Sequence, residues 1–306
     1  MEPREIRNVA LLDLTGAEAG AALEGVTRIV NVATILVPQS LVPKLSSIPL
    51  ERVAATVPIP DGRRVRVFSG QITMAGEARA APADGVEETL VITGQLILTS
   101  PCTEVGRDVV VMGQVVAPSG SEAGLGRALR NMTGQATYYP YTPGARVFAI
   151  SGGQMAGEAL ASLGGQPEDL PLITGSLILT SKPESVGYNS VIVLGNVLVP
   201  RGGEATLYGR VLPQGGRIIA YDAPTRVFDG SYSIGATFFE MLPEPITLVI
   251  DGHCTIDADV TPEMVRDKVR GLVFDGHLTA PRTVLGALQA VALSLDGKLS
   301  ADDSVD

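Results

Sequence analysis

A short phrase of apolar and polar positions recurs about a dozen times along the chain, with a small residue near its centre. Clear copies are Val91-Ile92-Thr93-Gly94-Gln95-Leu96, Ile173-Thr174-Gly175-Ser176-Leu177 and Val249-Ile250-Asp251-Gly252-His253. The small residues that mark the copies run from Ala10 to Gly297 at a spacing of roughly 20 residues, within the range of repeat proteins. The pattern therefore predicts a stack of similar structural coils, one for each copy of the phrase.

Each phrase is a predicted β-strand, because it is short, rich in Val, Ile, Leu and Thr, and bounded by Gly, Pro and Ser. We expect Val91, Leu96 and Leu98 to face the interior, and Pro60-Asp61-Gly62 to turn a corner between coils. Four connectors have helical patterns, with Thr261 as the expected start of the third; they are Glu18–Gly25, Glu122–Asn131, Pro262–Arg270 and Thr283–Ala292. The predicted fold is mainly β: a parallel β-solenoid of roughly 15 coils of about 20 residues, with short helices on one flank.

A longer period is also present. Thr93-Gly94-Gln95-Leu96-Ile97-Leu98 returns almost unchanged as Thr174-Gly175-Ser176-Leu177-Ile178-Leu179, so about four coils form a larger, duplicated unit. Because each coil of a solenoid contacts only its neighbours, we expect a single repeat domain over residues 1–306. An irregularity is expected near 120–143, where the pattern weakens, and a short acidic tail at 300–306.

Composition narrows the classes of function. A net charge of −10 argues against nucleic acid as a partner, and the one basic run, Arg63 to Arg66, is predicted to be a solvated turn. No apolar run approaches the length that crosses a membrane, and no signal peptide is evident, so we expect a cytoplasmic protein. Two cysteines make no disulfide framework: Cys254 is an expected core residue, and Cys102 is expected in an exposed turn.

The sharpest candidate for chemistry is a series of aspartates in the same phase of successive phrases. Since positions i and i+2 of a strand share a face, Asp251, His253, Asp275 and His277 are predicted to converge. Two imidazoles and two carboxylates suit a divalent metal such as zinc. The alternative is that Asp-Gly sets a turn and that the polar residues are merely solvated. The full series is Asp229, Asp251, Asp275 and Asp296.

A second series consists of glutamines that follow the small residue. Stacked amides hydrogen-bond to one another along a β-stack, so a structural role accounts for this series, although it also offers a flat docking face. Its members are Gln71, Gln95, Gln114 and Gln135.

The first and last strands of a stack of parallel strands expose unpaired backbone N–H and C=O groups. Such edges can pair with a strand of another chain. The first predicted strand begins close to residue 1 and is apolar, which leaves little room for a polar cap. We therefore expect self-association through Ile6, Val9 and Leu11.

The recurring Gly-containing strands, the lack of an enzyme motif and the absence of tryptophan give the chain a resemblance to the bactofilins, with Val91-Ile92-Thr93-Gly94-Gln95-Leu96 as a typical copy. The resemblance implies a bacterial, polymer-forming β-solenoid scaffold, similar to a cytoskeletal element. This chain departs from it in its greater length and in its helical inserts.

Three classes of function remain. The first is a non-enzymatic cytoplasmic scaffold that associates with itself as a homo-oligomer or filament, without a cofactor. The second is a repeat-type module that binds a protein partner. The third is a metal-binding or carbohydrate-active protein that uses the aspartate series.

Overall fold

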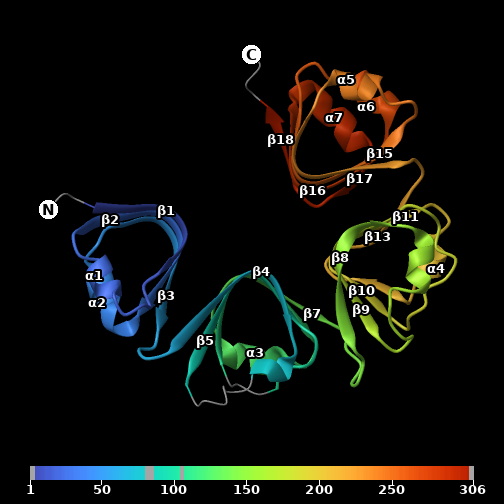
Figure 1. The fold of residues 1–306 in the computed structure, drawn as a ribbon. Coiled ribbons are helices and arrows are strands. Elements are labelled where there is room, and N and C mark those ends of the chain that lie inside the picture. Colours follow the sequence, from blue (N-terminus) through green and yellow to red (C-terminus); the bar gives the residue numbers. More distant parts are fainter. Residues whose placement is uncertain (1–3, 80–85, 104–106, 303–306) are drawn as a thin grey trace. The chain divides into compact units, whose positions relative to one another are not determined.

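The computed structural model describes residues 4–79, 86–103 and 107–302. Contacts divide the chain into two compact units, Met1–Pro143 and Gly144–Asp306. Each unit holds two stacks of parallel strands, which we name A and B in the first unit and C and D in the second (Figure 1). The unit boundary lies at the end of the stretch near 120–143 where the sequence pattern weakens.

In the first unit, the layers of each stack follow one another in chain order. Stack A consists of β1 (Arg4–Asp13), β2 (Val26–Pro38) and β3 (Leu50–Ile59). Stack B consists of β4 (Arg64–Met74), β5 (Glu88–Leu98), β6 (Asp108–Pro118) and β7 (Leu129–Tyr139). Their helical segments are α1 (Ala19–Ala22), η1 (Gln39–Leu41), α2 (Val42–Ser46), η2 (Gly76–Arg79) and α3 (Glu122–Ala128).

In the second unit, some layers are split into two short strands. Stack C contains β8 (Val147–Met155), β9 (Leu170–Leu179), β10 (Val191–Val193) with β11 (Val197–Pro200), and β12 (Val211–Pro213) with β13 (Ile218–Tyr221). Stack D contains β14 (Thr225–Ile234), β15 (Ile246–Ile256), β16 (Val269–Pro281), and β17 (Ala292–Leu295) with β18 (Lys298–Asp302). The helical segments are η3 (Gly157–Ala161), α4 (Glu204–Leu207), α5 (Ala236–Glu240), α6 (Pro262–Lys268) and α7 (Arg282–Ala290).

The prediction of one solenoid of roughly 15 coils is therefore wrong, although the mainly β class is confirmed. The strands lie in separate parallel sheets of three to six strands, one of them barrel-like. Gly94, Gly175 and Gly252 fall in three different sheets. The longer period of about four coils, not the shorter phrase, corresponds to one stack: among the described residues, stacks B, C and D have four layers each and stack A has three. The start of the predicted acidic tail, Ser300 to Asp302, belongs to β18, and 303–306 lie outside the described residues.

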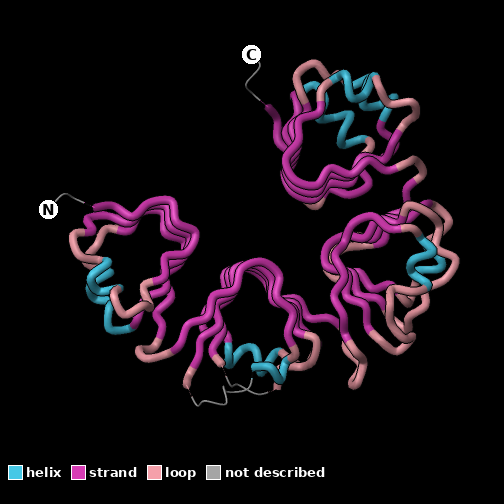
Figure 2. The backbone as a smooth tube through the Cα atoms, viewed as in Figure 1, coloured by secondary structure: helices cyan, strands magenta, loops and turns pink. Residues whose placement is uncertain are grey.

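Within a stack, the central small residue is where each strand bends. Gly70, Gly94, Gly113 and Gly134 lie in register in stack B, all with positive φ. Figure 2 shows the strands of each stack curving into an arch, with helical segments on its open side. In stack A, the bend falls on Asn8, Asn31 and Arg52, whose φ angles are 55°, 56° and 53°, and not on small marker residues such as Ala10.

Each arch encloses its own core, and a second apolar layer joins the two stacks of a unit. Leu96 and Leu98 point into the core of stack B, as predicted. Val91 does not: it packs with Val57 and Ile59 of stack A, on the outer face of the arch. In the second unit, Ile178 and Leu198 of stack C meet Val249 and Val273 of stack D. These strands are apolar on both faces because both faces are covered.

The start of α6 follows a local capping rule. Thr261 begins α6 as predicted, since its hydroxyl accepts a hydrogen bond from the backbone N–H of Met264 at 3.3 Å. Cys254 is buried, also as predicted, and burial raises the pKa of its thiol to about 11. Cys102 is fully buried, so the expectation of an exposed turn is wrong.

The basic run beside Asp61 is not a simple solvated turn. Arg63 forms an ion pair with the buried carboxylate of Asp108. Arg66 Nε lies 2.9 Å from Oε1 of Glu88, which is buried as well. Buried carboxylates are retained in folded proteins when they are paired. The arginines of this run therefore link the start of β4 to the starts of β5 and β6.

Candidate functional site

The aspartate series occupies neighbouring layers of stack D. Asp229, Asp251 and Asp275 pair in register on β14, β15 and β16, each directly before the glycine at the bend. The backbone N–H of Asp296 donates to the carbonyl oxygen of Phe274, which places Asp296 in the next layer.

Three of these aspartates line a groove between stacks C and D. Its volume is about 270 Å³, and its wall on stack D carries Asp229, Asp251 and Asp275. The wall on stack C carries hydroxyl groups and backbone, and the floor is aliphatic. The stack C wall is formed by Ser151, Gly152, Gly153, Thr174, Gly175, Ser176 and Asn196, and the floor includes Ile178, Leu198, Val227, Val249 and Val273.

The carboxylates of the aspartate series differ in their electrostatic surroundings. Partial burial raises the pKa of Asp251, and the negative charges of Asp275 and Asp229 raise it further. Asp296 shows the opposite shift: hydrogen bonds from the hydroxyl of Ser294 and the amide of Asn196 lower its pKa. The series is thus not a uniform ladder.

Asp296 belongs to a polar link between the two stacks. Asn196 of stack C donates from Nδ2 to Oδ2 of Asp296 over 3.0 Å, and its Oδ1 accepts from the backbone N–H of Arg217 at 3.1 Å. Arg217 in turn donates from Nη2 to the carbonyl oxygen of Leu293 at 3.0 Å and to the hydroxyl of Ser294 at 2.9 Å. Asn196 is buried, so these bonds fix the register between stacks C and D.

The two histidines lie next to each other but not in the groove. His253 and His277 pair in register, with ring centroids 6.0 Å apart. Between each aspartate and its histidine, the chain bends at Gly252 or Gly276, whose φ angles are 121° and 125°, so the rule that i and i+2 share a face does not apply. His277 Nε2 lies 3.0 Å from the hydroxyl of Ser300, on the far arm of the arch.

The residues of the predicted metal site are therefore brought together as two separate pairs. Among the described residues, no group of three or more His, Cys, Asp or Glu side chains is arranged to hold a metal ion. Binding of a divalent metal by Asp251, His253, Asp275 and His277 stays a prediction from the sequence.

The glutamine series supports the structural interpretation. Gln71, Gln95, Gln114 and Gln135 lie in register across stack B. Gln95 donates from Nε2 to Oε1 of Gln114 over 2.6 Å, so two central amides of the series bond to each other, whereas Gln135 donates to the hydroxyl of Thr137 on its own strand at 3.4 Å.

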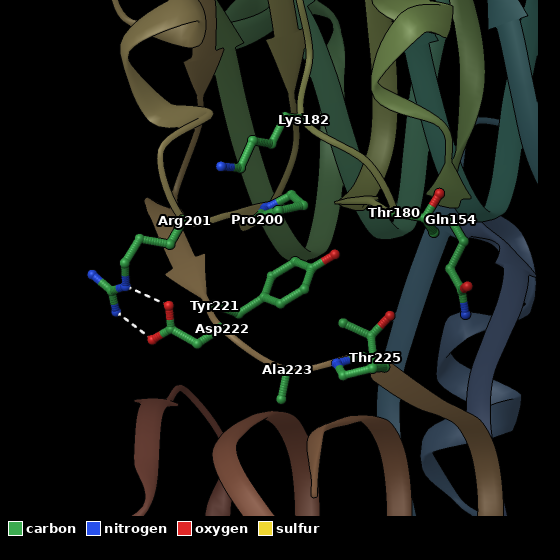
Figure 3. A pocket seen from close by; sticks show the side chains of 10 residues that line it. Gln154, Thr180, Lys182, Pro200, Arg201, Tyr221, Asp222, Ala223 and Thr225 are labelled. Carbon is green, nitrogen blue, oxygen red and sulfur yellow. Dashed lines mark hydrogen bonds and ion pairs between the residues drawn. The ribbon is translucent and has the colours of Figure 1, made fainter. Parts of the chain in front are cut away.

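A second, wider hollow lies where stack C passes into stack D (Figure 3). Its volume is about 570 Å³, and Lys182, Arg201 and Tyr221 are among its lining residues. Arg201 holds Asp222 with two bonds, Nε–Oδ1 at 2.6 Å and Nη2–Oδ2 at 2.8 Å, and the Tyr221 hydroxyl donates to the carbonyl oxygen of Leu179 at 2.6 Å. Arg201, Asp222 and Tyr221 are thus engaged in hydrogen bonds within stack C and the segment that follows it.

The outer strands of the stacks expose side chains that inner strands bury. Val67 of β4 is 41% exposed, whereas Val91, its partner in register on β5, is fully buried. Tyr232 of β14 is 47% exposed, and its partner Cys254 on β15 is buried. Leu50 on β3 and Leu295 on β17 are exposed in the same way. The open ends of the stacks therefore combine uncovered strand edges with apolar side chains.

The residues predicted to mediate self-association lie on β1, which pairs on one side only, with β2. Ile6 and Val9 are half-buried against the core of stack A, and Leu11 packs toward stack B. One edge of the β1 backbone has no strand paired to it among the described residues, but these three side chains already pack partly within their own unit. The sequence pattern did not reveal that Leu50, Val67 and Tyr232 are exposed. An apolar residue in the first or last layer of a stack has the same sequence pattern as an apolar residue in a middle layer.

Over the described residues, the structure contains no helix with the length and apolar character needed to cross a membrane.

The resemblance to the bactofilins is wrong, because separate short sheets replace the long solenoid on which it depends. Comparison with known proteins gives no identity: no family model matches the chain, and no significant match exists among the curated proteins or the solved structures.

Proposed function

We propose that this protein is a non-enzymatic structural component that associates with further copies of itself through the open ends of its strand stacks. The observation that carries the proposal is the contrast between Leu50 and Ile29, which occupy the same position in adjacent layers of stack A. Leu50 is 40% exposed on β3 at the open end, and Ile29 is fully buried one layer further in. Another strand placed on β3 would complete the burial of Leu50.

The physical basis is the behaviour of uncovered β-edges. A strand that pairs on one side only presents a row of N–H and C=O groups that accepts another strand. Natural edge strands are usually protected by charges or by a covering loop; β3, β4, β14 and β17 each carry an exposed large apolar side chain, and the first three also carry charged residues. Pairing would satisfy the backbone and bury those side chains together. The predicted location in the cytoplasm belongs to this proposal.

Replacing the exposed apolar residues of the edges tests the proposal. The triple variant Leu50→Lys, Val67→Lys, Tyr232→Lys places a charge on three open edges without touching the interior. The matched control is Tyr208→Lys with Met241→Lys, because these two residues are exposed and lie at the ends of helices α4 and α5, not on a strand.

The measurement is sedimentation velocity over a hundredfold range of concentration, with negative-stain imaging of the same samples. We expect large or elongated species for the wild type and the control, and a monomer for the edge variant. A wild-type protein that remains monomeric throughout would refute the proposal and favour a module that binds a different protein.

A further inference from the structure

A row of alternating charges crosses stack A from its first layer to its last. Arg7 on β1 forms an ion pair with Glu5 of the same strand, and Arg28 on β2 lies 3.2 Å from both Glu5 and Glu51. The alternation ends on Arg7 at the first layer and on Glu51 at the last, and both side chains are largely exposed. The last layer therefore offers an acidic group where the first layer offers a basic one.

The register of the stack brings these groups into line. Ile29 of β2 lies between Ile6 and Leu50, and Val30 lies between Arg7 and Glu51. In the same way, Val32 lies between Val9 and Val53. If the pattern continued by one layer beyond β3, a second β1 would place its Ile6 beside Leu50, its Arg7 beside Glu51 and its Val9 beside Val53.

The backbone shape also repeats. Asn8, Asn31 and Arg52 bend their strands with almost the same left-handed φ. Asn31 donates from Nδ2 to Oδ1 of Asn8 over 2.7 Å, so the side chains at the bend contact each other from layer to layer. An added β1 would bring Asn8, a neutral residue with the same bend, against Arg52.

We infer that a second copy of the chain adds its β1 to β3 of the first, in parallel and in this register, so that Arg7 of one copy pairs with Glu51 of the other. The inference rests on the proposed function and specifies which ends meet. Because the two surfaces differ, the contact is head-to-tail and does not form a two-fold dimer.

Stack B is less suited to the same contact. Its outer strands both carry basic residues, Arg64 and Arg66 on β4 and Arg130 on β7. Pairing β7 with a second β4 would bring like charges to neighbouring layers, which destabilises cross-strand pairs.

Charge reversal with mixing tests the inference. Arg7→Glu and Glu51→Arg each place like charges at the proposed contact, so each variant alone is expected to associate at least about tenfold more weakly than the wild type. Mixing the two variants restores opposite charges in every contact and is expected to recover association. Arg266→Glu, which makes the same change of charge on the exposed face of helix α6, is the control and is expected to behave as the wild type.

Light scattering and sedimentation of each variant, of the mixture and of the wild type distinguish the outcomes, and thermal unfolding checks that each variant is folded. Recovery in the mixture supports the contact, since a merely damaged fold would not recover on mixing. If the wild type associates and both single variants associate equally well, the inferred contact is wrong while the proposed function stands. If the wild type does not associate at any concentration, the proposed function fails, and the inferred contact fails with it.

Discussion

At the scale of single residues, the bend of each strand decides which amino acids the repeat accepts. The glycines of stack B lie directly over one another, and a Cβ at Gly113 would overlap the carbonyl oxygen of Gly94. The φ of Gly113 is 140°, a value that side chains with a Cβ rarely adopt. In stack A, a φ near 55° at Asn8 and Asn31 is the left-handed region that asparagine tolerates, so no glycine is needed there.

Gly113→Ala is therefore expected to lower the free energy of unfolding by about 2–4 kcal/mol, because it adds backbone strain and a steric overlap in the middle of stack B. Gly126→Ala is the matched control, since the residue is in α3 and a Cβ added there would have no other atom within 4 Å. The control should be neutral or slightly stabilising. Urea unfolding followed by circular dichroism gives both values, and equal stability of the two variants would contradict the role of the bend.

Asp251 and Asp296 should have opposite effects on stability as a function of pH. The pKa of Asp251 is raised in the folded state, so the folded protein binds more protons than the unfolded chain between the unfolded and folded pKa values, and stability falls as pH rises through that interval. The pKa of Asp296 is lowered, so its contribution is present above the unfolded pKa and is lost as pH falls through the folded one.

Asp251→Asn is expected to raise the thermal unfolding temperature at pH 7 and to have little effect near pH 3. Asp296→Asn should lower that temperature at pH 7, and the difference should shrink in acid. Scanning calorimetry of both variants across this range provides the check. A destabilised Asp251→Asn protein at pH 7 would show that the carboxylate has a favourable partner in the groove.

At the scale of elements, stacks C and D differ in the side chains that follow the bend of each strand. The positions just after the bend in stack C include Ile178 and Leu198, which pack against stack D. The equivalent positions of stack D are Thr255 and Thr279, and the hydroxyl of Thr279 lies 3.4 Å from that of Ser300. This face of stack D is therefore polar where the corresponding face of stack C is aliphatic.

Thr255→Ile with Thr279→Leu would restore the aliphatic pattern on this face. We expect the double variant to gain an additional, sideways association that is absent from the wild type, because a new apolar patch favours contact. The matched control is Thr255→Asn with Thr279→Asn, which keeps the face polar. Dynamic light scattering in the presence of the edge substitutions separates this new association from pairing at the stack ends, and an unchanged particle size would contradict the expectation.

The sequence was informative about strands and less informative about where a stack stops. The phrase around Gly94 identifies its strand, and the Thr261 cap identifies the start of α6. Pro60-Asp61-Gly62, however, has the composition of a corner within a stack, and it connects stack A to stack B instead. A corner and a connection both need polar residues and tight turns, so composition does not separate them.

The groove and the edges were predictable to different degrees. The repeat phase correctly places Asp229, Asp251 and Asp275 in adjacent layers. The bend at Gly252 separates the aspartates from the histidines, and no periodicity of two residues can reveal it. The apolar outer face at Val91 had a visible signal, since Leu90 to Ile92 is continuously apolar, a pattern typical of strands covered on both faces.

At the scale of the whole molecule, several short stacks provide more open strand edges than one long solenoid of equal length. Each stack has a first and a last layer, and the outer strands β1 and β3 of stack A carry complementary charge and shape. Edges that remain exposed promote uncontrolled pairing, so a register fixed by Arg7, Glu51 and the bend would restrict pairing to one arrangement.

Hydrogen–deuterium exchange of the wild-type protein at low and high concentration measures this pairing at the backbone. If copies add β1 to β3, the peptides that cover Arg4–Asp13 and Leu50–Ile59 will exchange more slowly as the concentration rises, while those of the central strand β2 will change little. Exchange in both outer strands that is independent of concentration, in samples that span the range of the sedimentation experiment, would contradict the account.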